Sequence, residues 1–275
     1  MPEMVTIKGS LRWKPVRIIE VTAETPRMKT LVIEVPGWEG HRPGQHVDVR
    51  LTTEDGYSVQ HSYSIASSPT EKRLRFLVGR ADDGKLTLYL VDEPREGYKL
   101  EVRGPIGAHF TWDTHMGGPL VLVAGGSGIA PLMSMIRHRT AVGSDVPTRL
   151  LYSSRSPDDI AYRDELDYLV KSNKFIEVVY TLTRIQPPVW TGYRRRIDKE
   201  MLNEVAGQPE RNPLAFVCGP APLVQTVVTG LVELGHKPAR IKANCSWTDK
   251  RRVTNNAELA SSFVEGTKRQ RCSWR

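Results

Sequence analysis

Cysteine is scarce in this sequence, which holds only Cys218, Cys245 and Cys272 among its 275 residues. So few cysteines, odd in number, exclude a disulfide framework. A plant-type iron–sulfur cluster is excluded too, because it needs one more thiolate than the chain holds. The histidines show neither H-E-x-x-H nor Cys/His metal-site spacing, so we expect no metal site.

Long apolar runs are also absent. No stretch of about 18 apolar residues could cross a membrane. The first residues, MPEMVT, have neither the basic start nor the apolar run of a signal peptide. We therefore expect a cytoplasmic protein that makes no membrane contact.

Positive charge is in excess, with a net charge of +8. Half of that excess lies in residues 244–275, which hold seven basic and three acidic residues. Aromatic and basic residues do not interleave in the way that marks a nucleic-acid surface, so no nucleic-acid partner is expected. The mildly basic remainder suits an acidic protein partner or a phosphate-bearing cofactor.

The pattern of apolar residues changes near residue 117. Between about residues 16 and 103, short β-like runs alternate apolar and polar residues and are separated by Pro-Gly and Asp-Gly turns. This pattern predicts an antiparallel barrel or sandwich. Further on, apolar strands alternate with helical segments, which predicts a parallel sheet with helices on both faces. We expect these strands near residues 120–124, 149–152, 176–180 and 214–218.

The glycine-rich stretch Gly125-Gly126-Ser127-Gly128 follows the first of these strands. Glycine permits positive φ and carries no Cβ, so successive N–H groups and the start of the next helix can face an anion. Pro131 suits the first turn of that helix. The stretch lacks the full G-x-G-x-x-G spacing. From these residues alone, a phosphate site and a tight connection that binds nothing both stay open.

Further motifs flank this turn. His61-Ser62-Tyr63-Ser64 lies in the β half, and Cys218-Gly219-Pro220 follows the last predicted strand. With Arg-Pro-Gly-Gln at 42–45, Gly-Pro-Ile-Gly at 104–107 and Tyr-Arg-Asp-Glu-Leu at 162–166, the chain resembles the ferredoxin–NADP reductase family of flavoproteins over about residues 16–242. No fused two-iron ferredoxin domain is present.

The resemblance implies a two-domain fold. An N-terminal antiparallel β-barrel over residues 1–116 would bind FAD, and an α/β parallel-sheet domain over 117–243 would bind NAD(P). Residues 244–275 form an atypical basic tail, where the family has a strand ending in an acidic and an aromatic residue. Two interpretations of the tail stay open: a shifted reading frame, or a genuine tail of the polar kind that is typical of disorder.

For the flavin, the resemblance implies that Tyr63 lies against the isoalloxazine ring and that Ser64 forms a hydrogen bond near flavin N5. The backbone of the next three residues would surround the flavin and its ribityl chain. The amides of a later segment would meet the FAD pyrophosphate, with a threonine where the family has serine. These two groups are Ile65, Ala66 and Ser67, and Gly84, Lys85, Leu86 and Thr87.

His61 departs from the family, which usually has arginine at this position. Histidine offers fewer donors and an unperturbed pKa near ~6.5, so we predict weaker FAD retention. Losing one charge-assisted hydrogen bond weakens binding by about one to two decades. Arg80 could compensate.

For the nucleotide, the resemblance implies that Gly126, Ser127 and Gly128 cradle the pyrophosphate at a helix start. Residues after the second strand would read the adenosine ribose, and arginines there favour a 2′-phosphate, hence NADPH over NADH. Cys218 would pack near C4 of the nicotinamide. The ribose residues are Ser153, Ser154, Arg155 and Arg163, and the nicotinamide segment continues through Gly219 and Pro220.

The implied activity is hydride transfer from NAD(P)H to FAD, followed by electron delivery to a separate carrier such as a ferredoxin or an oxygenase component. We expect the enzyme to be a monomer. Two alternatives stay open. One is a free-standing flavoenzyme with a small-molecule or metal-chelate acceptor. The other is a non-catalytic electron-transfer subunit with impaired flavin binding, for which His61 and the altered end are the evidence.

Overall fold

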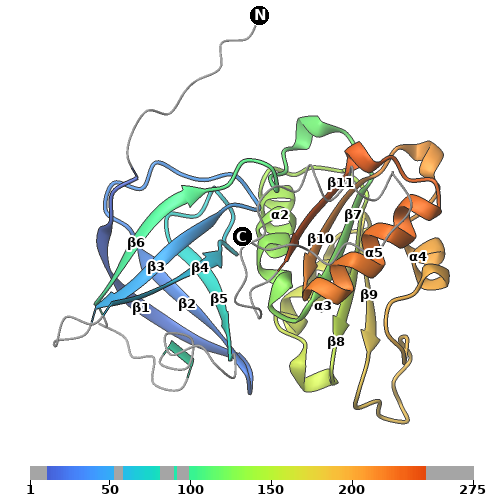
Figure 1. Ribbon diagram of the computed structural model, residues 1–275, viewed down its shortest axis with the longest axis horizontal. Coiled ribbons are helices and arrows are strands. Elements are labelled where there is room, and N and C mark those ends of the chain that lie inside the picture. Colours follow the sequence, from blue (N-terminus) through green and yellow to red (C-terminus); the bar gives the residue numbers. More distant parts are fainter. Residues whose placement is uncertain (1–10, 53–57, 81–89, 92–98, 246–275) are drawn as a thin grey trace, which may run out of the picture.

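The computed structural model describes residues 11–52, 58–80, 90–91 and 99–245. Two sheets stand side by side, each the centre of its own half of the chain (Figure 1). The predicted segment from Gly84 to Thr87 lies outside the described residues, as does the tail from residue 246 onward.

The first sheet is antiparallel, with the strand order β4-β3-β6-β1-β2-β5. A bridge between Ile65 and Phe76 joins the ends of this order, and the N–H of Ala66 donates to the carbonyl of Arg75 at 2.7 Å. The sheet therefore closes into the predicted antiparallel barrel. Its strands are β1 (Lys14–Thr25), β2 (Met28–Glu34), β3 (His46–Thr52), β4 (Ser58–Ser64), β5 (Leu74–Gly79) and β6 (Lys99–Ile106).

The second sheet is parallel, with the order β11-β10-β7-β8-β9. Every residue of β7 and β10 is buried, because helices cover both faces of these central strands. The strands are β7 (Leu120–Gly125), β8 (Thr148–Ser154), β9 (Ile176–Leu182), β10 (Leu214–Gly219) and β11 (Ile241–Cys245). Asn244 and Cys245, assigned to the tail by sequence, are the last residues of β11.

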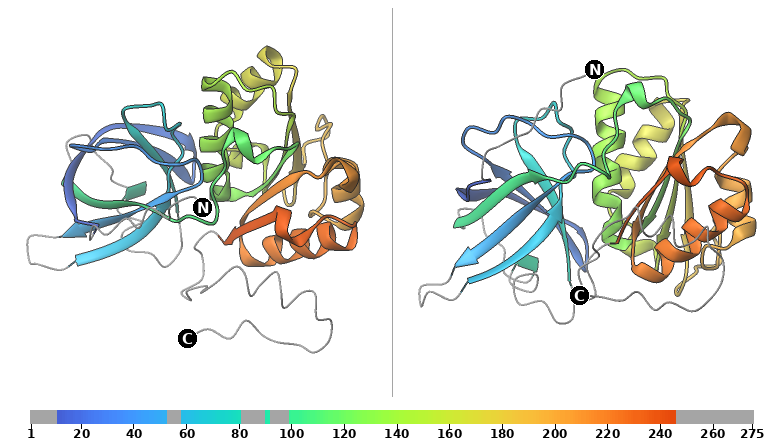
Figure 2. Two further views of the ribbon diagram at one scale, coloured as in Figure 1. Left: turned by 90° about the horizontal axis from the view of Figure 1, so that it is seen from above. Right: turned by 45° about the horizontal axis from the view of Figure 1, so that its top comes forward.

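In the described residues, helices cover this sheet in pairs, with α2 and α3 on one face and α4 and α5 on the other (Figure 2). The helices are α2 (Ile129–Ala141), α3 (Arg163–Ser172), α4 (Lys199–Val205) and α5 (Ala221–Glu233). Single 3-10 turns are η1 (Thr114–Met116), η2 (Gly126–Gly128), η3 (Pro157–Asp159), η4 (Pro209–Arg211) and η5 (Pro238–Arg240). The described residues include no helix long and apolar enough to cross a membrane.

Helix α2 faces the barrel, and apolar side chains are continuous across that boundary. Met28, Ala66 and Leu77 of the barrel belong to the same buried cluster as the inner face of α2. The Ser134 hydroxyl on α2 donates to the carbonyl of Ser67 at 2.7 Å. The two halves therefore share a packed and hydrogen-bonded boundary.

Candidate functional site

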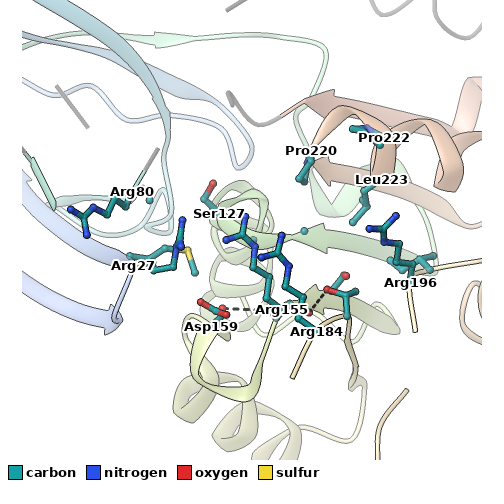
Figure 3. A pocket seen from close by; sticks show the side chains of 18 of the residues that line it. Arg27, Arg80, Ser127, Arg155, Asp159, Arg184, Arg196, Pro220, Pro222 and Leu223 are labelled. Carbon is teal, nitrogen blue, oxygen red and sulfur yellow. Dashed lines mark hydrogen bonds between the residues drawn. The ribbon is translucent and has the colours of Figure 1, made fainter. Parts of the chain in front are cut away.

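A cavity of about 560 Å³ lies where the barrel meets the carboxyl ends of the parallel strands (Figure 3). The chain leaves β7 toward β8 on one side, and β10 lies on the other, so the strand order reverses here. Open α/β sheets bind ligands at such a reversal. The lining residues include Arg27, Met28, Gly79 and Arg80 of the barrel, and Gly125, Gly126, Ser127, Ser153, Ser154, Thr183, Pro220 and Leu223 of the other half.

The glycine-rich turn packs directly on the end of β10. A Cβ on Gly128 would lie 2.2 Å from the Cys218 carbonyl oxygen, and one on Gly219 would lie 3.1 Å from the backbone nitrogen of Gly125. Gly126 differs, with φ +54° and no heavy atom within 4 Å of its would-be Cβ. Gly126 and Ser127 therefore open onto the cavity, whereas Gly128 permits close contact between two backbones.

Arginines give the cavity a positive lining. Arg27 and Arg80 come from the barrel, and Arg155, Arg184 and Arg196 come from the other half, whereas Asp159 is the one acidic residue among the described residues of the lining. The last three arginines are exposed, and no carboxylate of the described residues pairs with them. Guanidinium groups in this arrangement suit a phosphate-bearing ligand.

The ends of β8 and β9 bring two of these arginines together. The Thr183 amide and hydroxyl donate to the Ser154 carbonyl at 3.0 and 3.1 Å. The Arg155 carbonyl accepts from the amide of Arg184 at 3.0 Å. Ser153 and Ser154 are themselves buried, with 9% and 6% of their surface exposed.

Arg163, grouped with Arg155 by sequence, lies elsewhere. Its side chain is on α3, where it pairs with Asp167 at 3.9 Å and lies 5.9 Å from the Trp190 ring centre. It is not among the described residues that line the cavity. Sequence reasoning missed Arg184 and Arg196. The signal that could have found them is the basic residues clustered just after the predicted third strand.

Cys218 is buried, with 2% of its surface exposed, in the apolar cluster beneath α2. Burial strongly raises the pKa of its thiol, so the thiol is neutral at physiological pH. Among the described residues, neither Cys218 nor Gly219 lines the cavity, whereas Pro220 does. The structure therefore gives this segment close backbone packing and places only its last residue at the cavity.

On β4, His61 and Tyr63 lie on the same face, with ring centres 5.0 Å apart. Tyr63 is 6% exposed and stacks on Phe76 at 5.4 Å. Burial lowers the pKa of His61, so its ring is neutral at pH 7 and supplies no fixed charge. Ser64, the last residue of β4, is half-buried.

The three residues after β4 are fully buried, and two of them bind helix α2 through their carbonyls. Arg137 Nη1 donates to the Ala66 carbonyl at 2.6 Å, and the Ser67 carbonyl accepts from Ser134. Ile65 forms the bridge that closes the barrel. These contacts join the end of β4 and the residues after it to helix α2 of the second half. Arg80, expected as an aid to FAD binding, lines the cavity from the end of β5 (Figure 3).

Each half of the chain matches a known protein family. Residues 15–112 match the oxidoreductase FAD-binding domain, and residues 122–229 match the oxidoreductase NAD-binding domain. NADH-cytochrome b5 reductase 1 of Aspergillus terreus is 31% identical over 205 residues, covering 72% of this chain and 68% of that protein. The chain belongs to the ferredoxin–NADP reductase family. Like the family, it carries an FAD-binding and an NAD-binding domain in that order.

Other relatives of this family member are longer. The glycine betaine monooxygenase reductase subunit of Pseudomonas aeruginosa is 31% identical over 77% of the chain, which spans only 58% of that protein. Among solved structures, a ferredoxin NADP+ reductase from Neisseria gonorrhoeae with bound FAD and NADP superposes with a TM-score of 0.74. Its sequence identity is 20%, and the superposition covers 86% of this chain and all of that one, so it supports the fold.

The cavity of this reductase-family chain has the volume, the positive lining and the open glycine that a phosphate-bearing ligand favours. Its volume lies in the range of small-ligand sites. Among the described residues of its lining, five are arginines and one is acidic. Gly126 leaves space where a side chain would otherwise intrude. Gly126 and Ser127 also lie just before the N-terminus of α2, where backbone N–H groups favour anions.

Proposed function

We propose that this protein is an FAD-dependent oxidoreductase that takes hydride from NAD(P)H and delivers electrons to a separate protein carrier. One observation carries the proposal: an arginine-lined cavity sits between the FAD-binding and NAD-binding domains, at the point where the strand order reverses. FAD, when bound, supplies the chemistry by accepting hydride at N5 and releasing electrons. The chain supplies binding, orientation and exclusion of water.

The roles proposed for single residues follow from their positions. Gly126, Ser127 and the start of α2 would hold the nucleotide pyrophosphate, and Pro220 would border the nicotinamide. Gly128 and Gly219 act indirectly, by letting the two turns touch. In the barrel, Tyr63 and Ser64 would hold the flavin ring.

We propose NADPH as the preferred donor. Arg155, Arg184 and Arg196 face the cavity without a carboxylate partner in the described part of the chain. Unpaired guanidinium groups favour a ligand with an additional phosphate, and NADPH differs from NADH by its 2′-phosphate. We propose this preference although relatives of this chain are named NADH-cytochrome b5 reductases.

For the acceptor, we propose a ferredoxin or an oxygenase component that binds a monomeric reductase. The support comes from relatives named as reductase subunits or components, including the propane 2-monooxygenase reductase component of Mycolicibacterium goodii, 27% identical over 76% of the chain. The match covers 61% of that protein's length, so this chain spans only part of it.

The proposal is tested by purifying the full chain, measuring its FAD content and following NADPH-dependent reduction of a ferredoxin panel, with ferricyanide as the non-protein acceptor. We expect reduction of at least one ferredoxin at a rate that saturates with its concentration. Reduction of ferricyanide or small chelates alone would favour a free-standing flavoenzyme. Absence of FAD binding would favour the non-catalytic subunit and contradict the proposal.

A further inference from the structure

A buried chain of hydrogen bonds joins the barrel to the nucleotide half beside the cavity. Thr30 Oγ1 on β2 lies 2.7 Å from Glu24 Oε1 on β1 and 3.0 Å from Tyr162 Oη at the start of α3. The Tyr162 amide points at the other oxygen of Glu24 at 3.4 Å. Thr30 and Tyr162 are buried, with 4% and 5% of their surface exposed.

The direction of these bonds is fixed by chemistry. A threonine hydroxyl has one proton, and a carboxylate can only accept, so Thr30 donates to Glu24. The Tyr162 phenol must then donate to Thr30. Burial raises the pKa of Tyr162 to about 12, which keeps that proton on the phenol at neutral pH.

Tyr162 is held in this place against its backbone preference. Its φ is +59°, a left-handed conformation that is rare for a bulky residue. Arg137 covers the ring at 4.8 Å from its centre and is itself fixed by two bonds to Glu165, at 2.8 and 2.6 Å. Strained backbone persists where surrounding contacts enforce it, and it clusters at functional sites.

The two elements tied by this chain form facing parts of the cavity. Glu24 and Thr30 flank the hairpin tip that carries Arg27 and Met28, both of which line the cavity. Tyr162 ends the loop after β8, and that loop carries Arg155 and Asp159, which line it from the other half (Figure 3). The hydrogen bonds of Tyr162 therefore join two elements that line the cavity from opposite halves.

We infer that Tyr162 is a positioning residue: through Thr30 and Glu24 it fixes the β1–β2 hairpin against the loop after β8, and so sets the width of the nucleotide cavity. The inference rests on the proposed function, because it takes a pyridine dinucleotide as the occupant. It goes further by assigning a role to three residues that are not among the described residues lining the cavity. The expected signature is weaker nucleotide binding with an unchanged chemical step.

The test is isothermal titration of the FAD-loaded protein with NADP+ and, separately, NAD+. Tyr162→Phe removes only the hydroxyl and keeps the ring under Arg137. We expect the dissociation constant of the preferred nucleotide to rise about three- to tenfold, which corresponds to the loss of one hydrogen bond. The limiting rate of flavin reduction should stay within about twofold, so that KM changes and kcat does not.

Thr30→Val breaks the same link from the barrel side and carries the same prediction should Tyr162→Phe fold poorly. The double variant should bind the nucleotide no more weakly than either single variant. Both substitutions break the same hydrogen bond between Tyr162 and Thr30, so their effects should not add. Tyr180→Phe is the matched control, since its hydroxyl bonds Asp167 at 3.3 Å within the nucleotide half. Its dissociation constant should match that of the wild type.

A less than threefold change in both folded single variants, or a lower melting temperature with unchanged affinity, overturns the inference and leaves the proposed function intact. Additive losses in the double variant overturn it too. A wild-type protein that binds neither nucleotide overturns the proposed function, and the inference with it.

Discussion

The surroundings of the cavity and of strand β4 differ in whether backbone or side-chain atoms make the close contacts. Beside the cavity, Gly128 and Gly219 let backbone atoms approach closely, and arginines give the cavity its positive charge. On β4, side chains do that work, with Tyr63 stacked on Phe76 and His61 beside it. Backbone contacts cannot adjust to an added atom, whereas side-chain contacts can. Substitutions should therefore have all-or-none effects in the first region and graded effects in the second.

The largest effect is expected from Gly128→Ala. Its new Cβ would lie 2.2 Å from the Cys218 carbonyl oxygen, a backbone atom that cannot swing away. We expect a loss of more than about 4 kcal/mol in the free energy of unfolding, measured by urea denaturation. Gly126→Ala is the matched control, since its Cβ meets open space and the positive φ costs only about 1 kcal/mol. Equal losses in the two variants would contradict the account.

A smaller but selective effect is expected from removing the arginines of the cavity. Arg184→Ala or Arg196→Ala should lower kcat/KM for NADPH about tenfold to a hundredfold, the value of one charge-assisted hydrogen bond. The kcat/KM for NADH should stay nearly unchanged. Arg163→Ala, which changes an arginine outside the cavity lining, should alter neither. A parallel loss with both nucleotides would show that these arginines do not read the 2′-phosphate.

On the flavin side, His61→Arg should strengthen FAD binding by about one to two decades, because it replaces a neutral ring with a permanent fork of donors. The gain should be greatest at pH 8, where histidine is least protonated. Fluorescence titration of the apoprotein with FAD between pH 6 and 8 measures it. An unchanged affinity over this range would show that His61 does not face the pyrophosphate.

The smallest effect concerns pH and the whole molecule. Burial lowers the pKa of five histidines, namely His41, His46, His61, His138 and His236. Below about pH 6.5 these histidines bind protons in the unfolded chain but stay neutral in the folded one. The free energy of unfolding is therefore greatest above that pH and falls as the pH drops. We expect the melting temperature to fall by roughly 5 °C between pH 7.5 and 5.5.

Replacing the buried His236 by Gln should flatten this slope, because one group that refuses a proton has been removed. Asp48, Asp113 and Asp198 also have lowered pKa values, but they take up protons only at more acidic pH. Between pH 7.5 and 5.5 we therefore attribute the loss of stability to the histidines. A melting temperature that is constant or rises toward pH 5.5 would refute the assignment.

Local pattern predicted much of this fold. Period-two alternation predicted the antiparallel barrel, and alternating strands and helices predicted the parallel sheet, because each pattern reports which face an element buries. The glycine-rich turn was found at the cavity because strand ends converge in any such sheet. These inferences need only neighbours in sequence.

The parts that sequence could not place depend on distant residues meeting. Arg163 seemed near Arg155 by sequence, yet α3 carries it to Asp167, while Arg184 and Arg196 arrive from the end of β9 and the loop before α4. The contact of Tyr162 with Thr30 spans 132 residues and leaves no local pattern. Whether the thiol of Cys218 faces a cavity or a core is likewise decided by packing.

The most direct test of the central claim is anaerobic stopped-flow mixing of the FAD-loaded protein with NADPH, followed at about 450 nm, where the flavin absorbs. We predict rapid bleaching of the flavin at a rate that saturates with NADPH concentration. With NADH, the limiting rate should be lower or half-saturation should need a higher concentration. Flavin that stays oxidised with both nucleotides would contradict the claim that this cavity delivers hydride to FAD.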